Sequence, residues 1–370
     1  MNNSAPTFKS SRVESLDALR GFDMFWIIGG SEIFQGLARG TGNSFLNSLL
    51  PQLEHVDWAG FHFLDIIMPL FLFIVGAAMP FSFRKRRALG DGNRQLYAHV
   101  VKRVAILFIL GMMTQGNLFQ YSWSQLHIFI GTLPAIGAGY LVASLLMLNL
   151  NLRWQMVSTA GLLLLYWAVM MLVPVPGQAA GNLSPTGNLG FWLDHRIMQG
   201  FLPADRTYTQ LLNIMTFGST VMLGVFAGYV LQSNLSQQRK VGFLAGLGVG
   251  LLALGLLWSI WFPIIKHIWS SSFVLFAGGL SCLLLAAFYL VIDVLGFRKW
   301  AFGLKVIGMN AIAVYMATHL YDFRNIGNIF VGGLAGWTGE WYFCVQACAG
   351  FAVVWLILYW MYRQKTFLKI

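Results

Sequence analysis

Charged side chains are scarce in this sequence. Only 10% of its 370 residues are Asp, Glu, Lys or Arg, whereas 57% are hydrophobic. Soluble globular proteins carry about 25% charged residues, so an ordinary soluble domain is excluded. The composition is typical of a protein that lies in a lipid bilayer.

Cysteine is also rare, with three residues in the chain. Cys282, Cys344 and Cys348 all fall in apolar stretches, where cysteine commonly acts as a small hydrophobic residue. We therefore infer no disulfide framework and no metal site. The sequence lacks CxxC, HExxH, Walker A and GxGxxG motifs, so it carries none of these short metal- or nucleotide-binding signals. Residues 1–15 lack the features of a cleaved signal peptide, and we expect the first apolar stretch to be a retained helix.

Long apolar stretches are what the sequence has instead. A transmembrane helix needs about 20 predominantly apolar residues to cross roughly 30 Å of hydrocarbon. We predict an all-α integral membrane protein with about ten transmembrane helices, forming a single domain over residues 1–370. The stretches are at 18–37, 61–82, 100–115, 125–147, 154–174, 210–231, 241–263, 271–292, 304–322 and 341–362.

Lysine and arginine are distributed unevenly between the connecting segments. With the N-terminus inside, nineteen of the 24 basic residues lie on the inner side. Because basic connections stay in the cytoplasm, we predict that both termini are cytoplasmic. The net charge of +11 is then a signal of membrane topology, and it does not indicate nucleic-acid binding. Residues 174–209 form one long outer loop, whose composition suits a lid or sugar-binding loop as well as plain irregular structure.

Titratable residues gather just before the second apolar stretch, in EHVDWAGFHFLD. Asp65 lies at a helix start, where the helix dipole alone favours a carboxylate. His62 and Trp58 are close enough in sequence to pair with Asp65 or to contact a substrate. His55 is either a solvated loop residue or a catalytic base, because histidine takes up a proton near neutral pH.

The opposite end of the same stretch carries four basic residues, RKRR at 84–87. Such a run commonly fixes topology and contacts anionic membrane lipids. It also suits a phosphate site, because guanidinium groups bind phosphates well. The candidates for a cytoplasmic anion site are Arg20, Arg84, Arg86, Arg87 and Arg103.

Three polar residues inside predicted spans are further candidates. Ionisable groups at membrane depth are costly, which makes Glu32 and His319 candidates for substrate contact. Asn310, in GMNAIAVY, is either an ordinary interhelical hydrogen-bonding residue or a ligand contact.

Several segments together resemble the heparan-α-glucosaminide N-acetyltransferase family and its bacterial relatives. They are ESLDALRGFDMFWIIGG, HVDWAGFHFLDIIMPLFLFIVGAAM, PVPG, GFWLDHRI, GMNAIAVY and YRQKTFLKI, in order from about residue 12 to residue 370. The most specific is H-x-x-W-x-G-x-x-x-x-D-[LI]-[VI]-x-P. Ser31 or Glu32 stands where the family has an asparagine near the outer end of the first span, and His319 is offset by one position from the family's late histidine.

This resemblance implies transfer of an acetyl group from cytosolic acetyl-CoA to the amino group of a glucosamine on the far side of the membrane. The family's catalytic histidine matches His55, the motif aspartate matches Asp65, and Asn310 matches an asparagine that could contact the thioester. The resemblance also implies a bacterial inner-membrane location and a homodimer.

Two functions of different classes remain open from the sequence. One is an acyltransferase that uses acyl-CoA and an extracytoplasmic amino sugar or glycan. The other is a transporter or flippase for a sugar-like or lipid-linked substrate that uses the same polar helices. Inverted-repeat transporters tend to show paired interrupted helices in their two halves, and the His55 motif has no counterpart after residue 190.

Overall fold

The structure is a computed structural model that describes residues 13–203 and 207–368. The two chain ends and residues 204–206 of the predicted outer loop lie outside this range. The predicted cytoplasmic position of the termini therefore concerns residues that are not described.

Helices make up the regular structure of the described residues, and a single isolated β-bridge joins Ala59 to Ile265. The first half contains α1 (Glu14–Phe25), η1 (Trp26–Gly30), α2 (Ser31–Thr41), α3 (Ser44–Leu49), η3 (Phe63–Ile66), α4 (Ile67–Ala88), α5 (Asn93–Thr114), α6 (Thr132–Asn149) and α7 (Leu152–Leu172). The second half contains α8 (Leu189–Ile197), α9 (Asn213–Gln232), α10 (Gln237–Trp258), α11 (Ser271–Phe288), α12 (Phe302–Gly308), α13 (Ala311–Leu320), α14 (Phe323–Val331), α15 (Ala335–Thr338) and α16 (Tyr342–Arg363).

Eight helical segments within the described residues are long and apolar enough to cross a membrane. Each overlaps one of the predicted stretches, so the protein is an all-α integral membrane protein as the composition indicates. The segments are Phe63–Ala88, Asn93–Thr114, Thr132–Asn149, Leu152–Leu172, Asn213–Gln232, Gln237–Trp258, Ser271–Val294 and Phe323–Arg363. The count of ten spans stays a prediction.

The two remaining predicted spans, 18–37 and 304–322, are interrupted helices. The first changes to a π-helical turn at η1, where Gly29 has φ of 147°, a conformation that favours glycine. The second breaks at Asn310, between α12 and α13. Irregular backbone at membrane depth is tolerated where it is buried in protein or lines a cavity. Both breaks adjoin the cavities described below.

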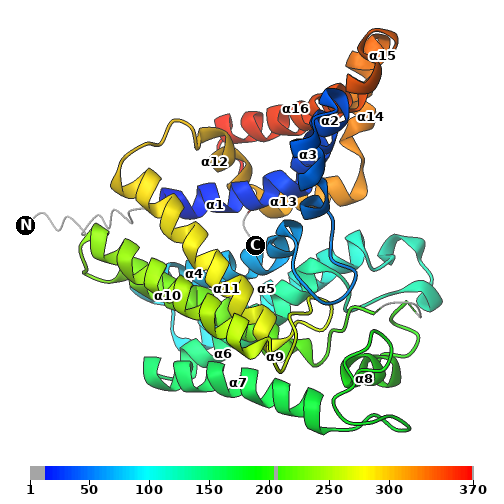
Figure 1. The fold of residues 1–370 in the computed structure, drawn as a ribbon. Coiled ribbons are helices and arrows are strands. Elements are labelled where there is room, and N and C mark those ends of the chain that lie inside the picture. Colours follow the sequence, from blue (N-terminus) through cyan, green and yellow to red (C-terminus); the bar gives the residue numbers. More distant parts are fainter. Residues whose placement is uncertain (1–12, 204–206, 369–370) are drawn as a thin grey trace, which may run out of the picture.

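The helices fall into two groups that lie side by side (Figure 1). Helices α4 to α11 form the larger group, and α1, α2 and α12 to α16 form the smaller one. Helix α1 packs against both α12 and α4, and α2 packs against α16. The first and last parts of the chain therefore form one unit beside the central bundle.

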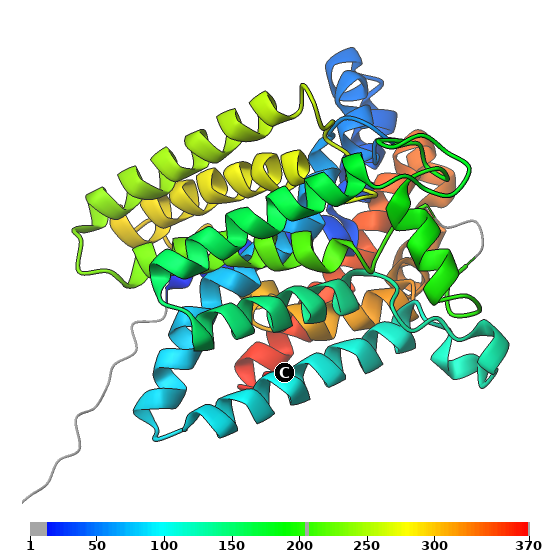
Figure 2. The same cartoon turned by 90° about the horizontal axis from the view of Figure 1, so that it is seen from below.

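The connections between helices differ between the two ends of the bundle (Figure 2). Short turns join α4 to α5, α6 to α7 and α9 to α10 at the end that we call the Arg84 end. Longer segments lie at the opposite end, called the His55 end; their described residues are 42–62, 115–131, 173–203, 207–212 and 259–270.

Close helix packing in the core depends on small residues. A Cβ added to Gly76 of α4 would lie 1.9 Å from the Val221 carbonyl oxygen, and one added to Gly224 of α9 would lie 2.0 Å from the Phe73 carbonyl oxygen. Such close approach of helix backbones is typical of helix pairs in membranes. Glycine therefore lets α4 pack closely against α9 along the wall of the cavities.

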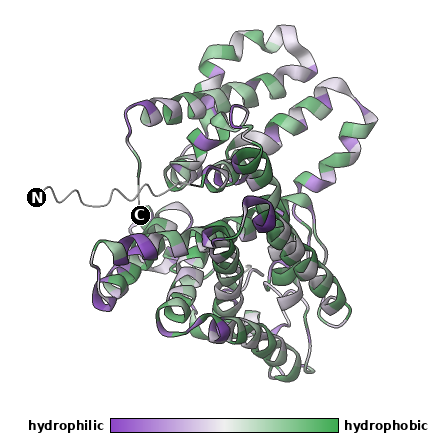
Figure 3. Ribbon diagram, turned by 90° about the vertical axis from the view of Figure 1, so that its left-hand side faces the viewer, coloured by the Kyte–Doolittle hydropathy of each residue, from purple (hydrophilic) through white to green (hydrophobic). Residues whose placement is uncertain are grey.

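Viewed from the Arg84 end, green and pale segments make up most of the ribbon, and hydrophilic segments are short (Figure 3).

Candidate active site

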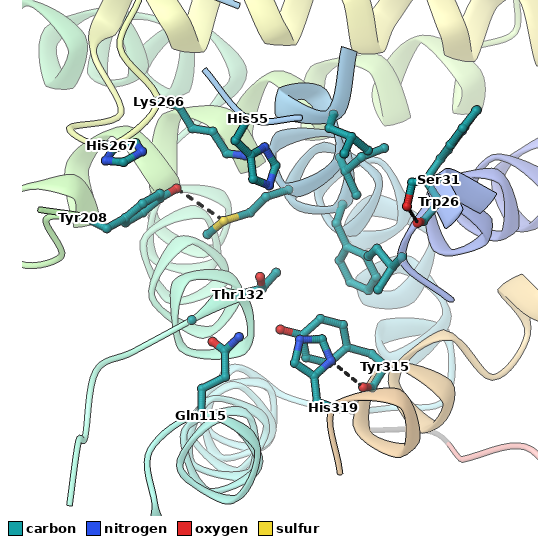
Figure 4. Close-up of a pocket in the computed structure, with 16 residues that line it drawn as sticks. Trp26, Ser31, His55, Gln115, Thr132, Tyr208, Lys266, His267, Tyr315 and His319 are labelled. Atoms are coloured by element: carbon teal, nitrogen blue, oxygen red, sulfur yellow. Dashed lines mark hydrogen bonds between the residues drawn. The ribbon is translucent and has the colours of Figure 1, made fainter. Parts of the chain in front are cut away.

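A cavity of about 400 Å³ opens near the His55 end, where the two helix groups meet. Its wall comes from η1, α2, η3, α4, α6, α13 and four connecting segments (Figure 4). The lining residues labelled in Figure 4 are Trp26, Ser31, His55, Gln115, Thr132, Tyr208, Lys266, His267, Tyr315 and His319. We call this space the outer cavity. It brings together residues from nearly the whole length of the chain.

Asp65 holds His55 in place. Its Oδ1 lies 2.8 Å from His55 Nδ1, and its Oδ2 accepts backbone hydrogen bonds from His62 at 3.0 Å and Val56 at 3.4 Å. The Asp65 side chain is 1% exposed, whereas that of His55 is 58% exposed. One buried carboxylate therefore caps η3, closes the preceding loop and orients the imidazole. The ten-residue spacing between His55 and Asp65 allows this contact but does not require it.

Lys266 completes the cluster, and the sequence did not single it out. Its Nζ lies 3.1 Å from Asp65 Oδ1 and 3.1 Å from His55 Nδ1. Burial lowers the pKa of the Lys266 ammonium, and the neighbouring Asp65 carboxylate partly offsets that effect. The amide of Gly60 donates to the Ile264 carbonyl at 2.9 Å, so backbone pairing also joins these two loops.

The cluster assigns a tautomer to His55. Because the Asp65 carboxylate can only accept, the 2.8 Å contact requires a proton on Nδ1. Lys266 then donates to the same carboxylate oxygen. Among the residues that the structure describes, the hydrogen bond of this imidazole is the one that Nδ1 donates to Asp65, while the Lys266 ammonium lies beside it and donates to the carboxylate. Nε2 carries the lone pair, and the ring points into the outer cavity beside Lys266 (Figure 4). A neutral imidazole held in this way is suited to accept a proton from a substrate.

Gln115, Thr132, Tyr315 and His319 form the wall opposite His55 (Figure 4). The His319 ring stacks on Tyr315 at 4.0 Å between centroids, and its Nδ1 donates to the Tyr315 carbonyl at 2.9 Å. Gly131 has φ of 82°, and a Cβ there would lie 1.6 Å from Gln115 Oε1. Glycine at this position therefore leaves room for the Gln115 amide beside the cavity.

The four residues predicted to contact a substrate lie in different places. His319 lines the outer cavity. Glu32 lies in an adjoining cavity of about 270 Å³, where it pairs with Arg324 at 3.2 Å. Trp58 donates to the Leu183 carbonyl at 2.9 Å, and His62 Nδ1 lies 3.2 Å from the Glu54 carbonyl. These last two residues hold connecting segments together and do not line the outer cavity.

A further space of about 240 Å³, which we call the inner cavity, is lined by Val75 and Ala78 of α4 and lies nearer to Arg84 along that helix. Arg20 of α1 and Arg103 of α5 both line it. The Arg103 guanidinium stacks over the Tyr140 ring at 4.4 Å, and its buried Nε makes no hydrogen bond to the described residues. Two of the five predicted anion-binding residues thus meet at one cavity.

The arginines of RKRR lie elsewhere. Arg86 pairs with Asp91 at 3.1 Å and contacts His99 at 3.0 Å. Arg84 and Arg87 are exposed, and none of the three lines the inner cavity. Their positions suit contact with lipid headgroups or with an anion at the surface of the Arg84 end.

Asn310 lies beside the inner cavity, but its amide is engaged by the C-terminal segment. Nδ2 donates to the Thr366 carbonyl at 3.2 Å, and Oδ1 accepts from the Leu368 amide at 3.0 Å. Phe367 and Leu368 line the inner cavity themselves. Contact between Asn310 and a ligand therefore requires this segment to move.

No group of three or more His, Cys, Asp or Glu side chains within 13–203 and 207–368 has the arrangement of a metal site. The outer cavity has room for a small organic ligand, and the inner cavity presents guanidinium groups suited to phosphate oxygens.

Comparison with known proteins bears on this geometry. A family model described as "Domain of unknown function (DUF5009)" matches residues 12–179. The mouse protein named heparan-alpha-glucosaminide N-acetyltransferase is 24% identical over 379 residues, and the human protein of that name is 26% identical over 377 residues. Each alignment covers 86% of this chain and 56% of the relative. The chain is a distant relative of these acetyltransferases.

This relationship confirms the resemblance that the His55 motif indicated. The chain spans about half the length of the curated relatives it matches. The family model covers the part of the chain that supplies His55 and Asp65, whereas Lys266 lies beyond it.

Proposed function

We propose that this protein is a transmembrane acyltransferase that moves an acetyl group from cytosolic acetyl-CoA to the amino group of an extracytoplasmic amino sugar or glycan. The observation that carries the proposal is the His55–Asp65–Lys266 cluster at one wall of the outer cavity, which shares the lining residue Phe71 with the cavity that holds two arginines. The distant relationship to N-acetyltransferases supports the same reaction class.

The donor is proposed to enter from the Arg84 end. Its phosphates would pair with Arg20 and Arg103 at the inner cavity, while Arg84, Arg86 and Arg87 would attract the anion to that surface. The pantetheine arm would then extend along α4 toward His55. Asn310 would contact the donor only after the Thr366–Leu368 segment has been displaced.

The acceptor is proposed to occupy the outer cavity, with His319 and the neighbouring polar side chains as contacts. The amine nitrogen of the acceptor attacks the thioester carbonyl carbon, and His55 Nε2 takes a proton from that nitrogen. The carbon–sulfur bond then breaks, the CoA thiolate leaves and takes up a proton, and an amide remains on the sugar. Asp65 stabilises the imidazolium that forms in this step, as a buried carboxylate does beside a catalytic histidine.

We favour this direct transfer over a route through an acetylated His55. The imidazole is half-exposed, and an acetyl-imidazole formed there would be open to hydrolysis. The two routes are distinguished by mixing the protein with acetyl-CoA alone. Release of CoA before any acceptor is added would support the covalent route, whereas direct transfer requires both substrates together.

A transporter or flippase is the second candidate function. The observation that favours it is the pair of interrupted helices, at Gly29 and at Asn310, because broken helices often form transport sites. Transport would move the sugar unchanged, so the chemical state of the product separates the two functions.

The deciding experiment uses purified protein in liposomes with radiolabelled acetyl-CoA and glucosamine. We expect acetylated glucosamine from the parent protein and none from His55→Ala, while CoA binding is retained because the inner cavity is unchanged. Transfer by His55→Ala at the parental rate would refute the proposed chemistry. By analogy with the family, we also propose a bacterial inner-membrane location and a homodimer, which sizing in mild detergent would test.

A further inference from the structure

Phe71 of α4 lines both the outer cavity and the inner cavity. Its side chain is 3% exposed, so it is buried between them. The outer cavity holds His55, and the inner cavity holds Arg20 and Arg103. A single phenylalanine thus stands where the two spaces adjoin.

One face of α4 runs along both cavities. Leu64, Ile67 and Met68 precede Phe71 on the outer side, and Val75 and Ala78 follow it on the inner side. These residues recur at spacings of three and four, which places them on one side of a helix.

Helix α13 provides a second continuous face. Ile312 lines the inner cavity, and Tyr315 and His319 line the outer cavity at the same helical spacing. Helices α4 and α13 therefore each line both cavities. The helical segment from Leu64 of η3 to Ala78 of α4 is about 20 Å long.

We propose that Phe71 is the barrier between the two cavities and that it selects acyl donors by the size of the acyl group. This inference rests on the proposed function, because the thioester carbonyl must pass Phe71 to reach His55 from the inner side. The Phe71 ring has no ionisable group, so it acts by occupying space and takes no part in proton transfer. A two-carbon acyl group requires the smallest displacement of the ring, and each further methylene must find room beside side chains that are already closely packed. We therefore expect acetyl-CoA to be preferred over longer acyl-CoA donors.

The first test compares acyl donors of increasing length, from acetyl-CoA to hexanoyl-CoA, with glucosamine as the acceptor. We expect Phe71→Ala to raise the kcat/KM ratio of hexanoyl to acetyl donor at least tenfold, and Phe71→Leu to raise it less. The matched control is Phe81→Ala, which lies on the same helix and lines neither cavity. An unchanged ratio in active, monodisperse Phe71→Ala protein would overturn the selection of donors.

A second test does not depend on catalysis. In a variant whose three native cysteines are replaced by alanine, His55→Cys places a thiol in the outer cavity. A membrane-impermeant methanethiosulfonate is added to the Arg84 side of oriented vesicles. We expect labelling from that side to increase at least tenfold when Phe71→Ala is added, while Phe81→Ala leaves it unchanged.

The two tests separate the two proposals. Equal labelling with and without Phe71→Ala would refute the barrier, whatever the activity. Increased labelling in a protein that transfers no acyl group to any amine would refute the proposed function and retain the barrier. If Phe71→Ala unfolds, Phe71→Leu gives the same comparisons with a smaller change in volume.

Discussion

Lys266 Nζ lies 3.1 Å from His55 Nδ1, although 211 residues separate them in the chain. Both atoms also contact the same buried oxygen of Asp65. The candidate base therefore lies beside a carboxylate from η3 and an ammonium from the 259–270 segment.

Asp65→Asn should leave the fold intact and lower the turnover number by about 10²–10⁴-fold, since the amide no longer fixes the Nδ1 proton or stabilises the imidazolium. Acetyl transfer by purified protein measures the effect, and size-exclusion profiles report folding. Asp57→Asn, at an exposed carboxylate in the same loop, is the control and should retain parental turnover. Loss of folded Asp65→Asn protein would instead assign Asp65 a purely structural role.

Lys266→Met should lower the turnover number about tenfold, because it removes the charged hydrogen bond to the Asp65 oxygen that also holds His55. Lys266→Arg keeps the positive charge and should retain most of the parental turnover. Acetyl transfer by purified protein measures both variants. Equal losses in Lys266→Met and Lys266→Arg would contradict this electrostatic role.

Gly131→Ala should destabilise the protein by about 1–3 kcal/mol, because φ of 82° is unfavourable for alanine and its Cβ would meet Gln115. Thermal unfolding in detergent measures the change. Gly242→Ala is the matched control. Gly242 lies in α10, and a Cβ added there would meet open space, so this substitution should be neutral or slightly stabilising. Equal effects at the two sites would argue against the Gln115 contact.

His319→Ala should raise the KM for the acceptor about tenfold, which corresponds to loss of roughly one good hydrogen bond. Glu32→Gln changes the adjoining cavity and should affect this KM less. The KM for acetyl-CoA should change in neither variant. A larger effect of Glu32→Gln would indicate that the acceptor binds in the cavity lined by Glu32 and Arg324, and not in the outer cavity.

Hydropathy predicted the eight long helices because each must present apolar side chains along its whole length. It could not predict the break at Gly29 or at Asn310, since a window average does not report backbone dihedral angles. Two adjacent glycines in IIGGSE and the polar residue in GMNA are the local signals for these breaks.

The pairing of His55 with Asp65 was within reach of sequence reasoning, because the two residues are ten positions apart and share one motif. Lys266 was not, because only tertiary packing brings its loop to that motif. One signal was available: Lys266 is among the few basic residues on the predicted outer side, where basic residues are disfavoured.

The predicted cation cluster shows a different limit. The sequence predicted that five arginines form one anion site at the same end of the molecule. In the structure, Arg20 and Arg103 line the inner cavity, and the other three do not. Arg86 instead pairs with the nearby Asp91, an interaction that short-range spacing could have indicated. Charge alone does not specify where a side chain points.

The backbone pairing of Ala59 and Gly60 with residues 264 and 265 can form only after both segments have been synthesised. His55 and Asp65 leave the ribosome about 200 residues before their partner loop. During that interval several apolar helices must insert into the bilayer while the histidine loop lacks its final support. The reactive centre consequently assembles late in biosynthesis, and a nascent chain cut short before Lys266 would hold its base without the cation that controls it.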